Sequence, residues 1–215
     1  MTRDELPSMR KDYGIDELSK KSVDKDPLIQ FEKWFKDAMK TEGVEANAFT
    51  LSTIGADGIP EGRIVLLKYY AEDGFTFYTN YNSEKAIQID KKPVGAMTFH
   101  WRTKERQVRV KGTISKVDSI ISDEYFKERP VGSRIGAWAS PQSKEIPDRA
   151  YLIKQAELIK AKFPEENQIP RPEFWGGYLI DPVKIEFWQG RPNRLHDRIV
   201  YEKIGKEWKT KRVAP

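Results

Sequence analysis

The segment from Ile185 to Arg198 holds the residues whose types and spacing are hardest to explain as ordinary structure. Arg194, His196 and Arg198 occupy alternate positions, so in a β-strand all three side chains would project from one face. Three potential cations side by side repel one another, which is costly unless an anion lies between them. Trp188, upstream of them, offers a flat surface for a ring system. This segment therefore indicates a binding site more than a structural strand.

A second group of polar residues comprises Tyr125, Arg129 and Ser133. Tyr125 and Arg129 are four residues apart and would share one face of a helix, and Ser133 follows after a Pro-Val-Gly break. Two hydroxyls and a guanidinium that point to one place can bind a phosphate without a glycine-rich loop. A helix C-terminus with a basic residue near its dipole explains the same spacing equally well. The spacing alone leaves both interpretations open.

A third stretch places Arg63 and Lys68 at the two ends of an apolar run. Residues five apart in a strand point to opposite faces unless a bulge intervenes, so the two cations could serve two different anions. On this motif alone, the ordinary solvated end of a strand is the better interpretation.

The composition of the chain excludes several kinds of functional site. The 215 residues include no cysteine, which excludes disulfides, cysteine nucleophiles and thiolate metal sites. The two histidines, His100 and His196, lie far apart, so we expect no metal site. The net charge of +5 and the pI near 9.1 suit nucleic acid or small anions. Acidic and basic residues interleave instead of forming a basic stripe, so nucleic-acid binding rests on net charge alone and we do not expect it.

The polar start of the chain contains no apolar stretch of signal-peptide length. The longest strongly apolar stretch, Ile64 to Leu67, is too short to cross a bilayer. We therefore expect a soluble protein that is not exported and does not enter a membrane, cytoplasmic if the source is bacterial. Residues 1–25 are charged and poor in large apolar side chains, which predicts a mobile N-terminal arm before a single domain over residues 26–215.

The remaining pattern predicts the elements that must position these residues. Asp26-Pro27 supplies an N-cap and a first-turn proline for a helix to about Lys40. Further helices are expected at about 84–91, 118–128 and 147–163. Stretches rich in β-branched and aromatic residues, bounded by turn residues, predict strands at 49–54, 63–70, 75–79, 94–101, 106–114, 175–180, 184–189, 198–203 and 208–212.

This order of elements indicates a mainly β fold, an antiparallel barrel with peripheral helices. No glycine-rich phosphate loop follows a strand, so a doubly wound dinucleotide-binding sheet is disfavoured. The ligand would have to be held by side chains.

The same residues match a known family. The run from Ile185 to Arg198 resembles the signature of the pyridoxine (pyridoxamine) 5′-phosphate oxidases. Shorter matches are RIVLLKYY at 63–70, FYTNYNSEKA at 77–86, ERQV at 105–108, RPVGSRIGAW at 129–138 and FWGGY at 174–178. The resemblance extends from about Arg10 to Pro215 with closely similar spacing. It implies an FMN-binding split β-barrel and a homodimer with flavin mononucleotide (FMN) at the subunit interface.

The resemblance also implies roles for individual residues. The residues that would hold the flavin are Arg63, Ile64, Val65, Leu66, Leu67, Lys68, Tyr78, Thr79, Lys85, Gln107, Gln142, Ser143, Trp188 and Arg198. The residues that would hold the substrate phosphate are Lys68, Tyr125, Arg129 and Ser133. Near the substrate ring would lie Arg194, Leu195 and His196, and the arm residues that can fold over it are Arg10, Lys11, Asp12 and Tyr13.

The implied reaction is oxidation of pyridoxamine or pyridoxine 5′-phosphate at the 4′ carbon to pyridoxal 5′-phosphate. Hydride passes to the flavin, and dioxygen reoxidises the flavin with release of hydrogen peroxide. The cofactor carries the redox chemistry, so the protein supplies position and charge. We expect Arg194 to orient the substrate and stabilise developing charge, and His196 to donate or accept a hydrogen bond.

One residue departs from the family pattern. The family often has Arg beside the lysine at the flavin phosphate, whereas this chain has Glu84 before Lys85. An acidic side chain pointing at a phosphate would lower affinity, so we expect Glu84 to point away and the flavin to be held more weakly than usual.

Two other functions compete with this one. A flavin reductase that uses nicotinamide cofactors would explain the flavin residues. It would not explain the second phosphate-binding site predicted at Tyr125, Arg129 and Ser133. A module that binds pyridoxal phosphate or flavin without turnover is favoured only by Glu84. Bleaching of the flavin by NADH would indicate the first, and peroxide release with pyridoxamine phosphate would exclude the second.

Overall fold

The structure is a computed structural model that describes residues 12–165 and 168–215. The chain divides into two compact units. The terminal unit contains the described residues up to Thr50, together with Ala96–Lys111 and Pro182–Pro215. The central unit contains Leu51–Gly95 and Gly112–Asp181. The expectation of one domain from residue 26 onward stays a prediction.

The secondary structure is mainly β. The strands are β1 (Ala48–Ile54), β2 (Pro60–Leu66), β3 (Tyr69–Ala71), β4 (Gly74–Asn80), β5 (Val94–Trp101), β6 (Arg106–Lys116), β7 (Trp175–Gln189), β8 (Asp197–Ile204) and β9 (Glu207–Arg212). They follow the order β2-β1-β5-β6-β7-β4-β3, and β8 pairs with β7 and with β9. The strands β1, β5, β6 and β7 contribute residues to both units.

In the terminal unit, helix α2 (Pro27–Glu42) begins as the sequence predicts. The Asp26 carboxylate accepts a hydrogen bond from the N–H of Leu28 at 2.8 Å, and Pro27 occupies the first turn. The helix buries Phe31 and Trp34. Their rings contact those of Phe99 and Phe187, with centroids 5.3 and 5.2 Å apart, so aromatic packing forms the core of this unit. A 3-10 turn, η1 (Gly43–Asn47), leads from α2 to β1.

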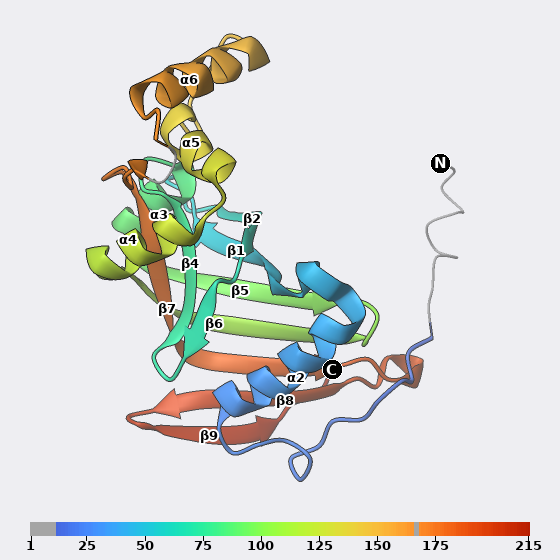
Figure 1. Cartoon of the computed structure of the whole chain (residues 1–215). Helices are drawn as coiled ribbons and strands as arrows, with labels where there is room; N and C mark the ends of the chain where they lie inside the picture. The colour runs from blue at the N-terminus through green and yellow to red at the C-terminus, as the bar shows by residue number, and fades with distance from the viewer. Residues whose placement is uncertain (1–11, 166–167) are drawn as a thin grey trace. The chain divides into compact units, whose positions relative to one another are not determined.

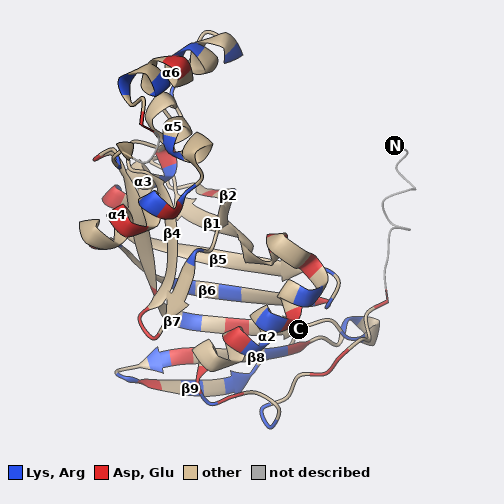
Figure 2. Ribbon diagram, viewed as in Figure 1, with Lys and Arg blue, Asp and Glu red and all other residues tan. Residues whose placement is uncertain are grey.

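The C-terminal strands complete this unit as an antiparallel hairpin (Figure 1). Strand β8 pairs with β7 from Lys184↔Glu202 to Gln189↔Asp197, and with β9 from Ile199↔Arg212 to Ile204↔Glu207. Glu202 forms ion pairs with Lys184 and Lys211, at 3.6 and 2.7 Å. Figure 2 shows both signs of charge along β8 and β9, so this hairpin presents no uniform basic stripe.

The central unit carries the other helices: α3 (Glu84–Lys91), α4 (Ser119–Glu128), α5 (Val131–Ala139) and α6 (Arg149–Lys162). Asp118 caps α4 through the N–H of Ile120, and Asp148 caps α6 through that of Tyr151, each at 2.8 Å. Strand β4 pairs antiparallel with β3 and with the first part of β7. A buried apolar cluster lies beneath the helices and consists of Phe126, Ile135, Ile169 and Trp175.

The structure corrects three predicted elements. The strand expected at 63–70 is interrupted after Leu66, because Leu67 turns inward and the Lys68 N–H bonds Thr76 O at 2.9 Å. The strands expected at 175–180 and 184–189 are one strand, because Pro182 fits extended backbone even though it donates no hydrogen bond. Helix α5 was not predicted: Pro130 precedes it, at the helix start, where a missing N–H is tolerated.

Two features are absent from the described residues. No helix among them is long and apolar enough to span a membrane. No group of three or more histidine, cysteine, aspartate or glutamate side chains in the same part of the chain has an arrangement that could hold a metal ion.

Candidate functional site

The central unit contains a cavity of about 780 Å³, which is within the usual range for a small-molecule or cofactor site. The end of β2, the end of β4 and the helices α3, α4 and α5 supply most of its walls. Its lining residues are Ile64, Val65, Leu66, Lys68, Tyr78, Thr79, Asn80, Lys85, Tyr125, Glu128, Arg129, Pro130, Ser133, Gly136, Ala137, Ser140, Gln142 and Trp175.

The charges that line this cavity favour an anion. Lys68, Lys85 and Arg129 are cationic, and Glu128 is the only acidic side chain among the described lining residues. The Lys85 ammonium donates to the hydroxyls of Thr79 at 3.3 Å and Ser83 at 3.2 Å, which holds it in place. Burial, and then the nearby Arg63, lower the pKa of Lys85, so an anion bound beside it would restore its preference for the charged form.

Arg129 follows α4 directly, and its guanidinium lies over the ring of Trp175, 4.4 Å from the centroid. Its Nη1 is buried and has no hydrogen-bond partner within the described part of the chain. Burial lowers the pKa of Arg129. A buried donor without an acceptor is costly, so this atom fits a ligand that brings oxygen acceptors, such as a phosphate.

Three aromatic rings stand nearly parallel in the cavity wall. The Tyr78 and Tyr125 centroids are 4.0 Å apart at an interplanar angle of 24°, and those of Tyr78 and Trp175 are 5.5 Å apart at 11°. Burial, and then Tyr125, raise the pKa of Tyr78 to about 12, and burial also raises the pKa of Tyr125. Both phenols are therefore neutral at physiological pH and can donate hydrogen bonds to an anion.

The cavity brings together residues from the two sets predicted from the sequence. From the flavin set it contains Ile64, Val65, Leu66, Lys68, Tyr78, Thr79, Lys85 and Gln142. From the substrate-phosphate set it contains all four, Lys68, Tyr125, Arg129 and Ser133. The roles of these residues stay predictions, but residues of both sets line the same cavity.

Three other residues of the flavin set lie in the central unit but do not line this cavity. Leu67 is buried. The Arg63 guanidinium is engaged by Thr53, Glu61 and the side chain of Gln88. The third residue, Ser143, belongs to a neighbouring hollow of about 500 Å³.

Glu84 also lines that neighbouring hollow, and it does not line the larger cavity. Lys85, the next residue along α3, lines the larger cavity. Neighbouring helix positions point in different directions, so the acidic side chain and the cation separate. The expectation that Glu84 points away from the flavin phosphate stays a prediction, and this separation is compatible with it.

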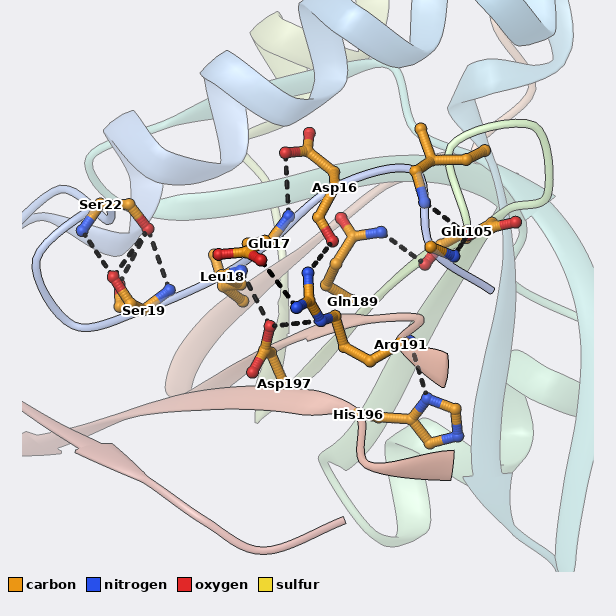
Figure 3. Close-up of polar contacts among 12 residues, drawn as sticks. Asp16, Glu17, Leu18, Ser19, Ser22, Glu105, Gln189, Arg191, His196 and Asp197 are labelled. Carbon is orange, nitrogen blue, oxygen red and sulfur yellow. Dashed lines mark hydrogen bonds and ion pairs between the residues drawn. The ribbon is translucent and has the colours of Figure 1, made fainter. Parts of the chain in front are cut away.

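In the terminal unit, a second group of predicted residues forms an aromatic cluster. The rings of Trp188 and His196 are 4.6 Å apart, and Tyr13 packs against both with centroid distances of 5.8 Å. His196 Nδ1 accepts a hydrogen bond from the backbone N–H of Arg191 at 3.1 Å (Figure 3). Burial, and then Arg194, lower the pKa of His196, while Asp197 has the opposite effect. The neutral ring therefore carries its proton on Nε2 and can donate from there.

The prediction that Arg194, His196 and Arg198 share one strand face is wrong. Arg194 ends a 3-10 turn, η3 (Pro192–Arg194), and β8 begins only at Asp197. Asn193 and Arg194 both have positive φ angles, 55° and 61°, which asparagine tolerates better than most residues. Arg194 and Leu195 are consequently exposed on a loop.

Arg198 and Gln107 are the remaining flavin-set residues of this unit. Arg198 lies in β8, where its Nε bonds the Glu186 carboxylate at 2.9 Å and its Nη1 bonds Ala214 O at 2.9 Å. Gln107 is half-buried on β6. The Glu186 carboxylate stabilises the positive charge of Arg198 on this strand, so that charge does not require a bound anion.

Of the predicted arm residues, Arg10 and Lys11 lie outside the described residues. Asp12 is exposed, and Tyr13 belongs to the aromatic cluster. The following residues make polar contacts across the terminal unit: the Leu18 N–H bonds Asp197 at 3.0 Å, and Glu17 pairs with Arg191 at 2.7 Å (Figure 3).

Sequence reasoning missed several residues of both sites. In the cavity these are Asn80, Glu128, Pro130, Gly136, Ala137, Ser140 and Trp175. Some of them belong to helix α5 and its start, which the sequence did not predict. In the terminal unit the missed residues are Glu105, Arg191 and Asp197, whose partners lie far away in the sequence. Trp175 was part of a recognised motif, FWGGY, and that was its available signal.

Comparison with known proteins identifies close relatives. A family model described as pyridoxamine 5′-phosphate oxidase matches residues 35–163, and one described as the pyridoxine 5′-phosphate oxidase C-terminal dimerisation region matches residues 175–215. The chain is 51% identical over 212 residues to a pyridoxine/pyridoxamine 5′-phosphate oxidase of Pseudomonas fluorescens, covering 98% of each protein. It is 49% identical to the protein of that name from Polynucleobacter asymbioticus, covering 99% of this chain and 100% of that one.

Solved structures confirm the fold. The structure of PhzG from Burkholderia lata 383, in complex with tetrahydrophenazine-1-carboxylic acid, matches with a TM-score of 0.83 and 26% identity, covering 94% of this chain and 99% of that one. A pyridoxamine 5′-phosphate oxidase-related, FMN binding protein from Nostoc punctiforme matches with a TM-score of 0.70 and 19% identity, covering 93% and 100%. The predicted fold class, a mainly β split barrel with peripheral helices, is confirmed.

Proposed function

Because the chain belongs to the pyridoxamine 5′-phosphate oxidase family of oxidoreductases, we propose that it makes pyridoxal 5′-phosphate with FMN as its cofactor. Its substrates are pyridoxamine 5′-phosphate and pyridoxine 5′-phosphate. Dioxygen accepts the two electrons and is released as hydrogen peroxide. With the amine substrate, water also enters and ammonia leaves, so the atoms balance.

The cavity of the central unit is the observation that supports this proposal most directly. It is lined by three cations, Lys68, Lys85 and Arg129, and one of them offers a buried donor without a partner among the described residues. Both the cofactor and the substrates are phosphate esters. A cavity with separate cationic side chains and several hydroxyls suits two phosphates better than one.

FMN fits the residues present. Lys85, fixed by Thr79 and Ser83, would neutralise the flavin phosphate, and the end of β2 with Gln142 would contact the remainder of the molecule. The resemblance to the family adds Trp188 and Arg198 to this set. Bound FMN supplies a two-electron acceptor, which no side chain of this cysteine-free protein provides.

The substrate phosphate is assigned to Lys68, Tyr125, Arg129 and Ser133. Arg129 is held over Trp175 and keeps its charge, so it can form charge-assisted hydrogen bonds to phosphate oxygens. Tyr125 is neutral because burial raises its pKa, so its hydroxyl can donate as well. These contacts fix the phosphate end of the substrate and thereby limit where its 4′ carbon can lie.

Arg194 and His196 are assigned to the substrate ring. Arg194 is exposed on its loop, so it is accessible to a ligand, and it orients the substrate and stabilises developing charge. His196 is neutral and donates from Nε2, because its Nδ1 is occupied by the Arg191 N–H. No strong general base is needed when the hydrogen leaves as hydride, and a neutral donor is consistent with that chemistry.

We further propose that the enzyme is a homodimer with FMN at the subunit interface. The C-terminal dimerisation region of the family covers residues 175–215 of this chain. Strand β2, at one end of the strand order, exposes the apolar side chains of Ile64 and Leu66, which are 66% and 43% accessible. Both line the cavity, so a second copy that covered them would also enclose a ligand there.

The decisive experiment is the absorbance spectrum of the purified protein before and after pyridoxamine 5′-phosphate is added without air. The proposal requires a yellow protein that bleaches with substrate and recovers with dioxygen, yielding peroxide. Bleaching by NADH instead would indicate a flavin reductase. A yellow protein that binds pyridoxamine phosphate and never bleaches would indicate a carrier.

A further inference from the structure

Glu105 is a buried carboxylic acid in an unfavourable backbone conformation. Only 2% of its surface is accessible, and its φ angle is +53°, a region where glycine or asparagine is usual. It ends a tight turn in which its N–H bonds Arg102 O at 3.2 Å. A charged residue is costly to bury and strained at this φ, so its side chain must make interactions that offset both costs.

Those interactions reach the N-terminal part of the chain. The Glu105 carboxylate Oε2 accepts hydrogen bonds from two consecutive backbone amides, Gly14 at 2.9 Å and Ile15 at 3.3 Å (Figure 3). Hydrogen bonds to an ionised carboxylate are stronger than those between neutral groups. We call residues 12–18 the anchored segment, because these two bonds join it to a residue 90 positions away.

The backbone of Glu105 makes a second connection, to the end of β7. Its carbonyl accepts the N–H of Gly190 at 2.8 Å and the side-chain amide of Gln189 at 3.3 Å. Trp188 immediately precedes these two residues. Glu105 therefore bonds the anchored segment through its side chain, and it bonds the strand end that carries Trp188 through its backbone.

Tyr13 lies at the meeting point of these connections. It directly precedes the anchored amides, and its ring packs edge-on against Trp188 and His196 at interplanar angles of 88° and 66°. Gly190 leaves the space for this packing, because a Cβ at that position would lie 2.8 Å from the Tyr13 ring and 3.1 Å from Glu105 Cβ. The positions of Tyr13 and Glu105 therefore require a residue without a side chain at position 190.

We propose that Glu105 is a positioning residue for the oxidation: its carboxylate fixes Gly14 and Ile15 so that Tyr13 is held against Trp188 and His196. This inference rests on the function proposed above. Glu105 does not act on the substrate itself. It sets the position of Tyr13, which in turn limits the movement of the His196 ring.

Two substitutions separate anchoring from folding. Glu105→Gly removes the carboxylate but suits the positive φ angle, so the turn and its backbone bonds to Gly190 and Arg102 are retained. Glu105→Gln keeps an oxygen acceptor and tests rescue by a similar side chain. Glu17→Gln is the matched control, because this carboxylate lies on the same segment, is 79% exposed and pairs only at the surface with Arg191.

The first measurement is hydrogen exchange of the FMN-loaded protein without substrate, over peptides that span residues 12–18. We expect exchange about tenfold faster in Glu105→Gly, which is the size of effect that loss of a charged hydrogen bond gives. Glu105→Gln and Glu17→Gln should exchange nearly as the parent protein does. Unchanged exchange in Glu105→Gly would overturn the anchoring role, whatever the protein is found to catalyse.

The second measurement is a double-mutant cycle with Tyr13→Ala, using kcat/KM for pyridoxamine 5′-phosphate. If Glu105 acts through Tyr13, each single substitution lowers kcat/KM by roughly tenfold and the double substitution lowers it no further. Losses that multiply to roughly a hundredfold would show that the two residues act independently, and would overturn the proposal. If no substrate bleaches the flavin of the parent protein, the function proposed above is refuted. The exchange measurement then still decides whether Glu105 anchors residues 12–18.

Discussion

The backbone N–H of Arg191 donates to Nδ1 of His196, five residues further along the chain. This bond selects the tautomer with the proton on Nε2, and it can exist only while the ring is neutral, because a protonated ring has no acceptor nitrogen. Burial and Arg194 lower the pKa of His196 and so favour the same neutral form. Geometry and electrostatics therefore agree on the state of this side chain.

Turnover should consequently fall on the acidic side as His196 becomes protonated. Because its pKa is lowered, the acidic limb should lie below the ordinary histidine pKa of about 6.5. The folded state binds this proton less readily than the unfolded state, so the stabilising contribution is present above about pH 6.5 and is lost as the pH falls. An NMR titration of the His196 ring and a pH profile of kcat/KM check both points.

His100→Gln serves as the control for that titration, because His100 is exposed on β5 and has no assigned role. Its replacement should leave the acidic limb in place, whereas His196→Gln should abolish it. An acidic limb that survives in His196→Gln would assign the titration to another group.

Arg129→Ala should weaken substrate binding while the flavin stays bound. The guanidinium supplies charge-assisted hydrogen bonds and a buried donor without a described partner, so we expect KM to rise roughly 10- to 100-fold. Arg129→Lys should recover only part of this, because an ammonium lacks the planar fork. Lys127→Ala is the control, since Lys127 is exposed and does not line the cavity. An unchanged KM in Arg129→Ala would remove Arg129 from the phosphate site.

Much of this cavity was predictable because most of its lining residues fall into a few short stretches of sequence, 64–68, 78–85 and 125–142. Tyr125, Arg129 and Ser133 fall within nine positions, a spacing compatible with a phosphate-binding site, and the resemblance to the family then selected that interpretation. Several of the residues missed, such as Gly136 and Ala137, lie in helix α5. The Pro-Val-Gly sequence was interpreted as a break, but Pro130 is the N-cap of α5, so a helix begins directly after it.

The terminal unit was less predictable because long-range contacts shape it. Alternation along β8 suggested that Arg194 and His196 share a strand face, but Asn193 and Arg194 adopt positive φ angles that interrupt the strand. No sequence pattern marks such a loop. The bonds from Glu105 to Gly14 likewise join residues 91 positions apart, which only the folded chain brings together.

Arg194→Ala should lose most turnover while FMN remains bound, because Arg194 is assigned to the substrate ring and not to the flavin. Loss of a group that stabilises developing charge typically lowers kcat by about 100-fold or more. Retained flavin absorbance and a normal melting temperature would show that the protein is intact. Arg149→Ala, at the start of α6, is a control of equal charge change. Near-normal turnover in Arg194→Ala would refute the assigned role.

Glu84→Arg should tighten FMN binding. Glu84 lines the neighbouring hollow, but it precedes Lys85, so its negative charge still acts through space on an anion bound at that lysine. Reversal of this charge at a partly solvated site should lower the FMN dissociation constant by roughly 3- to 10-fold, and less at high salt. Glu207→Arg on β9 changes the net charge equally and should have no effect. No tightening in Glu84→Arg would exclude Glu84 as a cause of weak flavin binding.

Gly112→Ala should destabilise the protein strongly, because the backbone of β7 lies close to this glycine of β6. A Cβ at position 112 would lie 2.1 Å from the carbonyl oxygen of Asp181, and a backbone atom cannot move aside as a flexible side chain can. We expect the free energy of unfolding to fall by about 3 kcal/mol. Gly132→Ala is the matched control, since nothing lies within 4 Å of its added Cβ in helix α5. Its stability should stay equal or rise by up to about 1 kcal/mol. Urea unfolding of both variants at one fixed protein concentration measures the difference, and equal stabilities would contradict the close approach of the two strands.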